Sequence, residues 1–149
     1  IAHALSHQCR FGGHLPKFYS VAKHSILCAQ LARRDEKLAA LLHDSAEAYL
    51  LDVPTPIKRR LSGYKDIEDK LMALIAKKFG FSYPLAKEIK DIDARMLQLE
   101  WDYLMLKTPI STTSKAEQVL QEMLVDYWTP EESKNMFLMS FKNLVKNNL

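Results

Sequence analysis

The segment 40-ALLHDSAEAYLLDVPTP-56 places a histidine and an aspartate side by side within an apolar run. Its leucines and alanines indicate a segment that packs in the protein interior. An ionised carboxylate is costly to bury without a partner, and buried charges in proteins are normally paired or bound to a metal. The pair His43–Asp44 therefore predicts partner residues elsewhere in the chain.

The composition is that of an ordinary globular protein. The chain has 149 residues, of which 48% are hydrophobic and 26% charged, with a formal net charge of +3. This length favours one domain over residues 1–149. The mild basicity does not indicate a nucleic-acid-binding protein, because its one notable cluster, 58-KRR-60, has the ordinary reading of a solvated helix face.

The same composition gives an expectation about location. No apolar run is long enough to cross a bilayer, and no signal-peptide pattern opens the chain. The two cysteines, Cys9 and Cys28, are too few for a disulfide framework and are not spaced as a zinc pair. We therefore expect a cytoplasmic protein that does not associate with membranes.

Helical periodicity dominates the sequence, and segments that alternate apolar and polar residues are absent, so an all-α fold is predicted. Asp35 is a plausible N-cap, Pro84 fits the first turn of a helix, and 129-TPEE-132 has the pattern of a capping box. The expected helices are 20–33, 36–50, 64–79, 84–106, 114–127 and one that begins after Thr129. Residues 109 and 111–114 are expected to interrupt the chain between the fourth and fifth helices.

Three of these helices each turn an unusual polar residue inward. His24 lies on the apolar face of its helix, where a lone histidine is more often a satisfied core residue than a ligand. Asp93 lies beside the apolar stripe of its helix, whereas Asp91 shares a face with charged residues; alone, Asp93 could be a partly buried acid paired with Lys or Arg. Together with His43 and Asp44 they offer two imidazoles and two carboxylates, a donor set that suits Zn, Mn, Fe, Co or Ni.

This pattern resembles the H…HD…D signature of the HD-domain metal-dependent phosphohydrolases. The segment 43-HDSAEAYLLDVPTPIK-58 is similar to the HD-x-x-E…D-[LIV]-P-[ST]-P-[VIL]-K block of the branch that contains deoxyribonucleoside 5′-nucleotidases and small phage dATP triphosphohydrolases. The opening 9-CRFGGHLPKFYSVAKHS-25 resembles the Arg–aromatic…V-x-x-HS entry of that branch, and 129-TPEESKNMFLMSF-141 resembles the closing helix of short phage HD proteins. One departure is Leu51, where the branch commonly has glycine.

The resemblance implies a single HD-domain helical bundle with one divalent transition metal, Zn, Mn or Co, held between helices by His24, His43, Asp44 and Asp93. It implies that Glu47 accepts a proton from the attacking water or holds that water in line. Glu47 could otherwise be a surface acid. Asp52 is implied to orient the water or to protonate the departing 5′-oxygen, and a turn or capping aspartate is an equally good interpretation.

Three further residues are candidates for substrate binding. Cationic side chains beside a metal–phosphate site clamp phosphate oxygens, which is the role expected of Arg10 and Lys58. Phe11 is expected to stack on the base or sugar, although a single phenylalanine is often an ordinary core residue. Arg59, Arg60 and Lys65 could add the charge that a triphosphate requires.

The resemblance implies an enzyme that acts on deoxynucleotides, and the expected activity is a dATP-preferring triphosphohydrolase that releases the nucleoside and triphosphate. The nearest alternative cleaves deoxynucleoside 5′-monophosphates. An alternative of another class is a helical nucleic-acid-binding or adaptor module with a structural metal. A homo-oligomer is also expected, and the C-terminal helix with Met136, Phe137, Leu138 and Phe141 could form its interface or part of the core.

Overall fold

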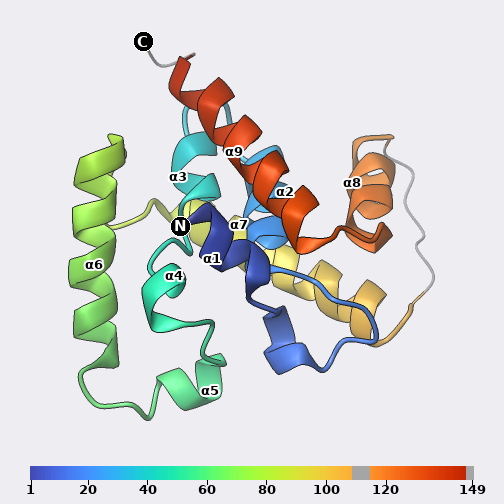
Figure 1. Ribbon diagram of the computed structural model, residues 1–149, viewed down its shortest axis with the longest axis horizontal. Coiled ribbons are helices and arrows are strands. Elements are labelled where there is room, and N and C mark those ends of the chain that lie inside the picture. Colours follow the sequence, from blue (N-terminus) through green and yellow to red (C-terminus); the bar gives the residue numbers. More distant parts are fainter. Residues whose placement is uncertain (109–114, 147–149) are drawn as a thin grey trace.

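The computed structural model describes residues 1–108 and 115–146, and in this part of the chain the fold is all-α, as predicted (Figure 1). Apart from an isolated bridge between Cys9 and Ser20, no β-structure occurs in the described residues. None of the described helices is long and apolar enough to span a membrane. The elements are α1 Ala2–His7, η1 Arg10–Gly13, α2 Val21–Leu31, α3 Lys37–Leu41, α4 Glu47–Leu50, α5 Thr55–Lys58, α6 Tyr64–Phe79, α7 Lys87–Glu100, η2 Trp101–Met105, α8 Lys115–Val125 and α9 Pro130–Lys146.

Helix α2 forms the centre of the molecule. It contacts α1, α3, α7, α8 and α9, and α9 crosses in front of it in Figure 1. The hydroxyl of Ser20 accepts a hydrogen bond from the backbone N–H of Lys23 at 3.1 Å, a cap whose removal typically costs ~1 kcal/mol. Fully buried Leu5, Leu27 and Met96 belong to the core around α2. The inward face of α2 is therefore fixed on several sides.

The helix predicted over 36–50 is wrong in its middle. The backbone forms α3, a turn over residues 42–46 and then α4, and Glu36 rather than Asp35 precedes α3. Tight bonds close the turn, with the N–H of Ser45 donating to the carbonyl of Leu42 at 3.0 Å. Consecutive residues of a regular helix diverge by about 100°. The tighter turn over residues 42–46 instead lets the neighbouring side chains of His43 and Asp44 face the same point.

The predicted helix 84–106 also differs from the observed one. Helix α7 begins at Lys87 and not at Pro84. Pro84 lies in a bend before the helix, and Ala86 is the N-cap. After Glu100 the helix continues as one π-helical turn, η2, in which the N–H of Leu106 donates to the carbonyl of Trp101 at 3.0 Å. The interruption predicted at 109 and 111–114 lies outside the described residues.

The two ends predicted from capping signals are confirmed. Gly80 ends α6 with a φ of +78°, in the left-handed region that favours glycine. Before α9, the N–H of Thr129 donates to the carboxylate of Glu132 at 2.7 Å, and the N–H of Glu132 donates to the hydroxyl of Thr129 at 3.2 Å. This reciprocal pair is the predicted capping box.

Helix α9 supplies core side chains. Phe137 is buried, and Met136 and Phe141 pack against the core, whereas Leu138 is exposed. The core interpretation of Met136, Phe137 and Phe141 is therefore confirmed.

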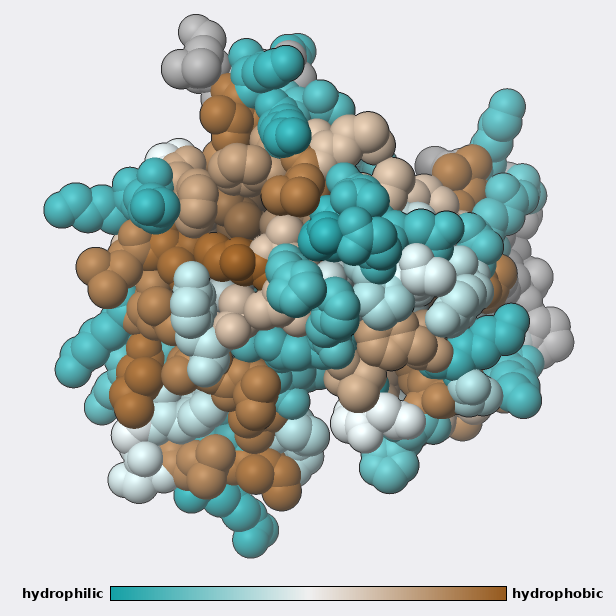
Figure 2. All heavy atoms as spheres, viewed as in Figure 1, coloured by the Kyte–Doolittle hydropathy of each residue, from teal (hydrophilic) through white to brown (hydrophobic). Residues whose placement is uncertain are grey.

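Figure 2 shows hydrophobic side chains gathered over the side of the molecule that carries α4, α5 and α6. Its exposed large apolar residues are Tyr49, Leu51, Ile57, Leu61, Ile67 and Leu74. The homo-oligomer expected from the sequence stays a prediction.

Candidate metal centre

The four predicted metal ligands converge on one point between α2, the turn before α4, and α7. His24 Nε2 lies 3.1 Å from Asp93 Oδ1 and 3.2 Å from His43 Nε2. His43 Nε2 in turn lies 3.2 Å from Asp44 Oδ2. Residues that are as much as 69 positions apart in the sequence thus place one donor atom each at a common centre.

Hydrogen bonds fix the orientation of both imidazoles. His43 Nδ1 lies 2.7 Å from the backbone oxygen of Ala40, and His24 Nδ1 lies 2.6 Å from Glu100 Oε1. Both partners are acceptors, so each Nδ1 carries the hydrogen, and in the neutral tautomer each Nε2 carries a lone pair. The centre therefore collects lone pairs from two nitrogens and two carboxylates. Such a set is satisfied by protons or by a cation.

The electrostatics of the centre agree with this. Burial lowers the pKa of His24 and His43, and the charge of Arg10 also lowers that of His24, but the surrounding acidic groups outweigh these effects and hold both pKa values well above the usual range. Burial raises the pKa of Asp44, yet the imidazoles lower it to about 2, and they depress the pKa of Asp93 further. The site stabilises positive charge where the four donors meet.

Glu100 supports the centre from behind, and the sequence analysis missed it. The fully buried carboxylate accepts hydrogen bonds from Arg10 Nε at 3.1 Å, Arg10 Nη2 at 2.9 Å and the Tyr19 hydroxyl at 2.8 Å, besides contacting His24. Against the effect of burial, His24 and Arg10 hold its pKa below the usual range. The available signal was its place two helical turns after Asp93, on nearly the same face of α7.

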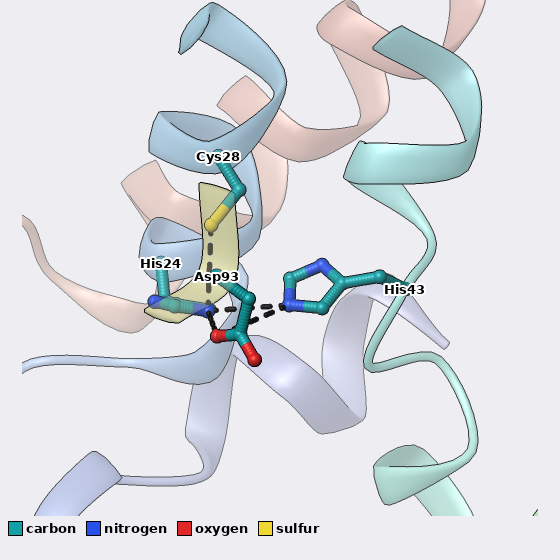
Figure 3. A group of neighbouring side chains, drawn as sticks. All are labelled: His24, Cys28, His43 and Asp93. Atoms are coloured by element: carbon teal, nitrogen blue, oxygen red, sulfur yellow. Dashed lines mark hydrogen bonds and ion pairs between the residues drawn. The ribbon is translucent and has the colours of Figure 1, made fainter. Parts of the chain in front are cut away.

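Cys28 also belongs to the centre, and it was not among the predicted ligands. Its Sγ lies 3.5 Å from His24 Nε2, and one donor atom each of His24, Cys28, His43 and Asp93 lies within 4.8 Å of the others (Figure 3). The structure therefore contains a possible metal-binding cluster of these four residues. The available signal was the spacing of four residues from His24 on one helix, which places both on the same face.

Glu47 lies next to this cluster, in the first turn of α4. It is buried, one of its carboxyl oxygens lies 3.6 Å from Lys58 Nζ, and the other is buried without a hydrogen-bond partner. Burial, with the charges of Asp44 and Asp52 adding to it, raises the pKa of Glu47 to about 9. Glu47 is thus a carboxyl group with one oxygen available to a ligand and the capacity to hold a proton near neutral pH.

Two cavities meet at the centre. The α6 cavity, about 440 Å³, extends between α6 and the start of α7 and is lined by Lys65, Glu68 and Lys90 among others. The α5 cavity, about 660 Å³, extends toward α5 and the end of α7 and is lined by Phe11, Asp52 and Trp101 among others. Both share one wall, which consists of Asp44, Glu47, Lys58 and Asp93.

The turn η1 presents two predicted substrate-binding residues at the α5 cavity. Phe11 and the two glycines after it have φ values of +55°, +58° and +79°, a left-handed run that is rare for a phenylalanine. The buried guanidinium of Arg10 lies 3.8 Å from Asp44. Burial lowers the pKa of Arg10, but the charges of Glu100 and Asp44 outweigh burial and raise it. The Phe11 ring lies 6.2 Å, centroid to centroid, from that of Trp101. Both rings line the cavity, so Phe11 is not an ordinary core residue.

The basic residues near α5 differ in whether they line the two cavities. Lys58 lies 2.8 Å from Glu68, and Lys65 is paired with Asp69. Arg59 and Arg60 are exposed and are not among the residues that line the two cavities. Of the predicted basic cluster, only Lys58 and Lys65 therefore reach these cavities.

Leu51 occupies a strained position at the end of α4. Leu51 has φ +68° and ψ 158°, a combination that is essentially restricted to glycine. Its side chain is 63% exposed, so little packing compensates the strain. Asp52 follows directly, and its backbone N–H donates to Gln8 Oε1 at 3.1 Å. The strained turn thus directs the chain from α4 into the wall of the α5 cavity.

Two curated proteins are similar to this chain. It is 46% identical over 100 residues to the uncharacterized protein YfdR of Escherichia coli (strain K12), which covers 67% of this chain and 56% of that protein. It is 36% identical over 114 residues to the uncharacterized protein RCAP_rcc00048 of Rhodobacter capsulatus, which covers 67% of this chain and 58% of that protein. The chain thus spans little more than half the length of these relatives. No model of a known protein family matches it.

Proposed function

We propose that this protein is a metal-dependent phosphohydrolase of deoxynucleotides, with a divalent Zn, Mn or Co ion held by His24, His43, Asp44 and Asp93. The observation that carries the proposal is the meeting of two imidazole Nε2 atoms, whose Nδ1 hydrogens are engaged elsewhere, with two carboxylates. Donors about 2.0–2.1 Å from a tetrahedral ion lie about 3.3 Å apart. Three separations between these donors, 3.1, 3.2 and 3.2 Å, lie near that value, and two are longer, 3.6 Å between His24 and Asp44 and 3.8 Å between His43 and Asp93.

When bound, such an ion lowers the pKa of water and offsets the charge that develops on a phosphoryl group. The chain supplies the remaining functions. Glu47 lines the same wall as Asp44 and Asp93 and has one unpartnered oxygen; the positive charge of a bound ion would favour its ionised form, which takes the proton of the water that attacks phosphorus. Lys58, 3.6 Å from Glu47, binds a phosphate oxygen, and Arg10, held by Glu100, supplies a second positive charge. The water oxygen bonds to phosphorus, the bond to the 5′-oxygen breaks, and that oxygen takes up a proton, for which Asp52 is the candidate donor.

The two cavities favour a triphosphate substrate such as dATP. A nucleoside triphosphate cleaved at its first phosphorus has a nucleoside on one side and further phosphates on the other. The α5 cavity, with Phe11 and Trp101, offers aromatic faces for a nucleobase. The α6 cavity, with Lys65 and Lys90, offers cations for the departing phosphates.

A second candidate, cleavage of deoxynucleoside 5′-monophosphates, is favoured by the charges of the α6 cavity. Lys58 and Lys65 are already paired with Glu68 and Asp69, which reduces the positive charge available to two further phosphates. A monophosphate needs only the shared wall and the α5 cavity. The adaptor alternative gains no comparable support, because a structural metal gives no role to the unpartnered buried oxygen of Glu47.

A product assay tests the proposal. The purified protein is incubated with each deoxynucleoside mono- and triphosphate and Mn²⁺ or Co²⁺, and the products are separated by ion-exchange chromatography. Nucleoside and intact triphosphate, fastest from dATP, are expected. Inorganic phosphate released from monophosphates alone would establish the second candidate. No product from any nucleotide would contradict both.

A matched pair of variants attributes any activity to the site. Glu47→Gln removes the proton acceptor and is expected to lower kcat by about 10²-fold or more, the usual contribution of a general base. Glu131→Gln, on the exposed surface of α9, is expected to leave kcat unchanged. Equal rates in both variants would refute the role of Glu47.

A further inference from the structure

We propose that Cys28 is a metal ligand that takes the place of Asp44 when the centre binds a thiophilic ion, so that Zn²⁺, Co²⁺ or Cd²⁺ is held by His24, His43, Asp93 and Cys28. The inference rests on the metal centre of the proposed function and is independent of hydrolysis. It exchanges one of the two predicted carboxylates for a sulfur donor, which gives the centre a preference among metals.

The geometry of α2 supports this ligand. Cys28 follows His24 by one helical turn, and its Sγ points to the Nε2 atom that also faces His43 and Asp93 (Figure 3). With a zinc–sulfur bond of about 2.3 Å, a tetrahedral ion places sulfur about 3.6 Å from an imidazole nitrogen. The observed separation of 3.5 Å between Sγ and His24 Nε2 fits that value.

The burial of the donors favours a ligand role over a chance contact. Cys28 is 1% exposed and His24 is fully buried, so the sulfur faces the cluster and not solvent. A buried cysteine alone would be a small apolar residue. Here three further donors lie within 4.8 Å of it and of one another, which a merely apolar role does not explain.

The centre also offers more donors than a tetrahedral ion uses. The side chain of Asp44 is 17% exposed on the cavity side, and its Oδ2 lies 3.2 Å from His43 Nε2. Cys28 approaches from the interior. Soft ions prefer thiolate sulfur, whereas harder ions such as Mn²⁺ prefer carboxylate oxygen. We therefore expect the fourth ligand to be Cys28 for thiophilic ions and Asp44 for Mn²⁺.

Absorption spectroscopy with Co²⁺ tests the proposal. The full chain, freed of metal with a chelator, is titrated with Co²⁺, and the near-ultraviolet band that reports a sulfur-to-cobalt bond is followed. Wild type and Cys9→Ser are expected to show the band, because Cys9 is the other cysteine of the chain. Cys28→Ser is expected to lose it. A band that persists in Cys28→Ser, or that disappears only in Cys9→Ser, would overturn the proposal.

Competition titrations provide a second measurement. Cys28→Ser is expected to lower the affinity for Cd²⁺ by about 100-fold or more, since even the loss of an outer hydrogen-bond partner costs 10–100-fold. Its affinity for Mn²⁺ is expected to change less than about twofold. Equal losses for both ions would contradict the proposal. Should the variant fail to fold, the ¹¹³Cd chemical shift of the wild-type complex decides whether sulfur is bound.

The outcomes separate this inference from the proposed function. Hydrolysis with Mn²⁺ but no sulfur band on Co²⁺ binding would refute the role of Cys28 and leave the phosphohydrolase intact. A sulfur band without hydrolysis of any nucleotide would support Cys28 as a ligand and contradict the phosphohydrolase.

Discussion

Lys23 and His24 are adjacent on α2, basic and almost completely buried, yet their surroundings differ in kind. Lys23 Nζ donates to the backbone oxygens of Leu124 at 3.2 Å and Asp126 at 2.5 Å, and it lies 4.8 Å from the centre of the Trp128 ring. His24 instead turns Nε2 toward a second imidazole nitrogen and toward carboxylates. The donor Nζ of Lys23 thus meets hydrogen-bond acceptors, whereas the acceptor Nε2 of His24 meets other acceptors.

The pKa values differ in the same way. Burial lowers the pKa of Lys23 to about 8, while the acidic groups around His24 raise its pKa against the effect of burial. The ammonium of Lys23 is satisfied by the C-terminal carbonyls of α8 and by aromatic faces, so it needs no further ligand. The surroundings of His24 are complete only with added positive charge. A buried polar residue thus indicates a ligand site when its neighbours cannot satisfy it.

The largest effect is expected on the His24 side, from Asp93→Asn. The amide is a weaker, neutral ligand, so metal affinity and kcat/KM are both expected to fall by about 100-fold or more, beyond the loss of an outer partner. Asp91→Asn is the matched control, because Asp91 is exposed on the same helix and paired with Lys87 at 2.6 Å. Metal titration and nucleotide hydrolysis measure both variants. Similar losses in the two would remove Asp93 from the centre.

On the Lys23 side, Lys23→Met removes the donor from two backbone carbonyls, one buried and one partly buried. An unpaired buried acceptor costs about 1–3 kcal/mol and the partly buried one less, so the free energy of unfolding is expected to fall by about 2–4 kcal/mol. Metal affinity of the folded variant is expected to change less than about twofold. Denaturant unfolding and metal titration distinguish the two effects, with the exposed Lys17→Met as control. A large loss of metal affinity at unchanged stability would reverse the comparison.

Glu100→Gln tests whether the hydrogen bond that Glu100 makes with His24 supports metal binding. The amide keeps the shape of the side chain but weakens its contacts to the His24 and Arg10 side chains. Metal affinity is expected to fall about 10–100-fold, the usual effect of an outer partner of a ligating histidine. Tyr19→Phe removes one hydrogen bond to the same carboxylate and is expected to leave metal affinity nearly unchanged. Equal affinities of Glu100→Gln and wild type would show that Glu100 is merely structural.

The smallest effect is expected at Leu51, which lies outside both environments. Leu51→Gly relieves a backbone strain of about 1–3 kcal/mol, less the conformational entropy that glycine costs. The free energy of unfolding is therefore expected to rise by about 1 kcal/mol, measured by denaturant unfolding. Ile57→Gly, within α5, is expected to lower it. Destabilisation by Leu51→Gly would show that the strain is absent.

The convergence of His24, His43, Asp44 and Asp93 could be predicted from sequence because each residue has a local signal. His24 and Asp93 follow from their places beside apolar stripes, and His43–Asp44 from a charged pair inside an apolar run. Glu100 was missed because its contact with His24 is made across the fold, and Cys28, one turn after His24 on α2, was missed because a buried cysteine is ordinarily a small apolar core residue. The turn over 42–46 was also missed, because its composition is that of a helix and only tertiary packing reveals its tightening.

The most direct test of the account is a calorimetric titration of chelator-treated protein with Zn²⁺ and with Mn²⁺. We predict binding of about one ion per chain to the wild type, because its single cluster of described donors surrounds one point. A variant with His24→Phe and His43→Phe, checked for folding by circular dichroism, is expected to bind neither ion. Absence of binding to the folded wild type, or equal binding to the variant, would contradict the claim that these buried histidines form a metal centre.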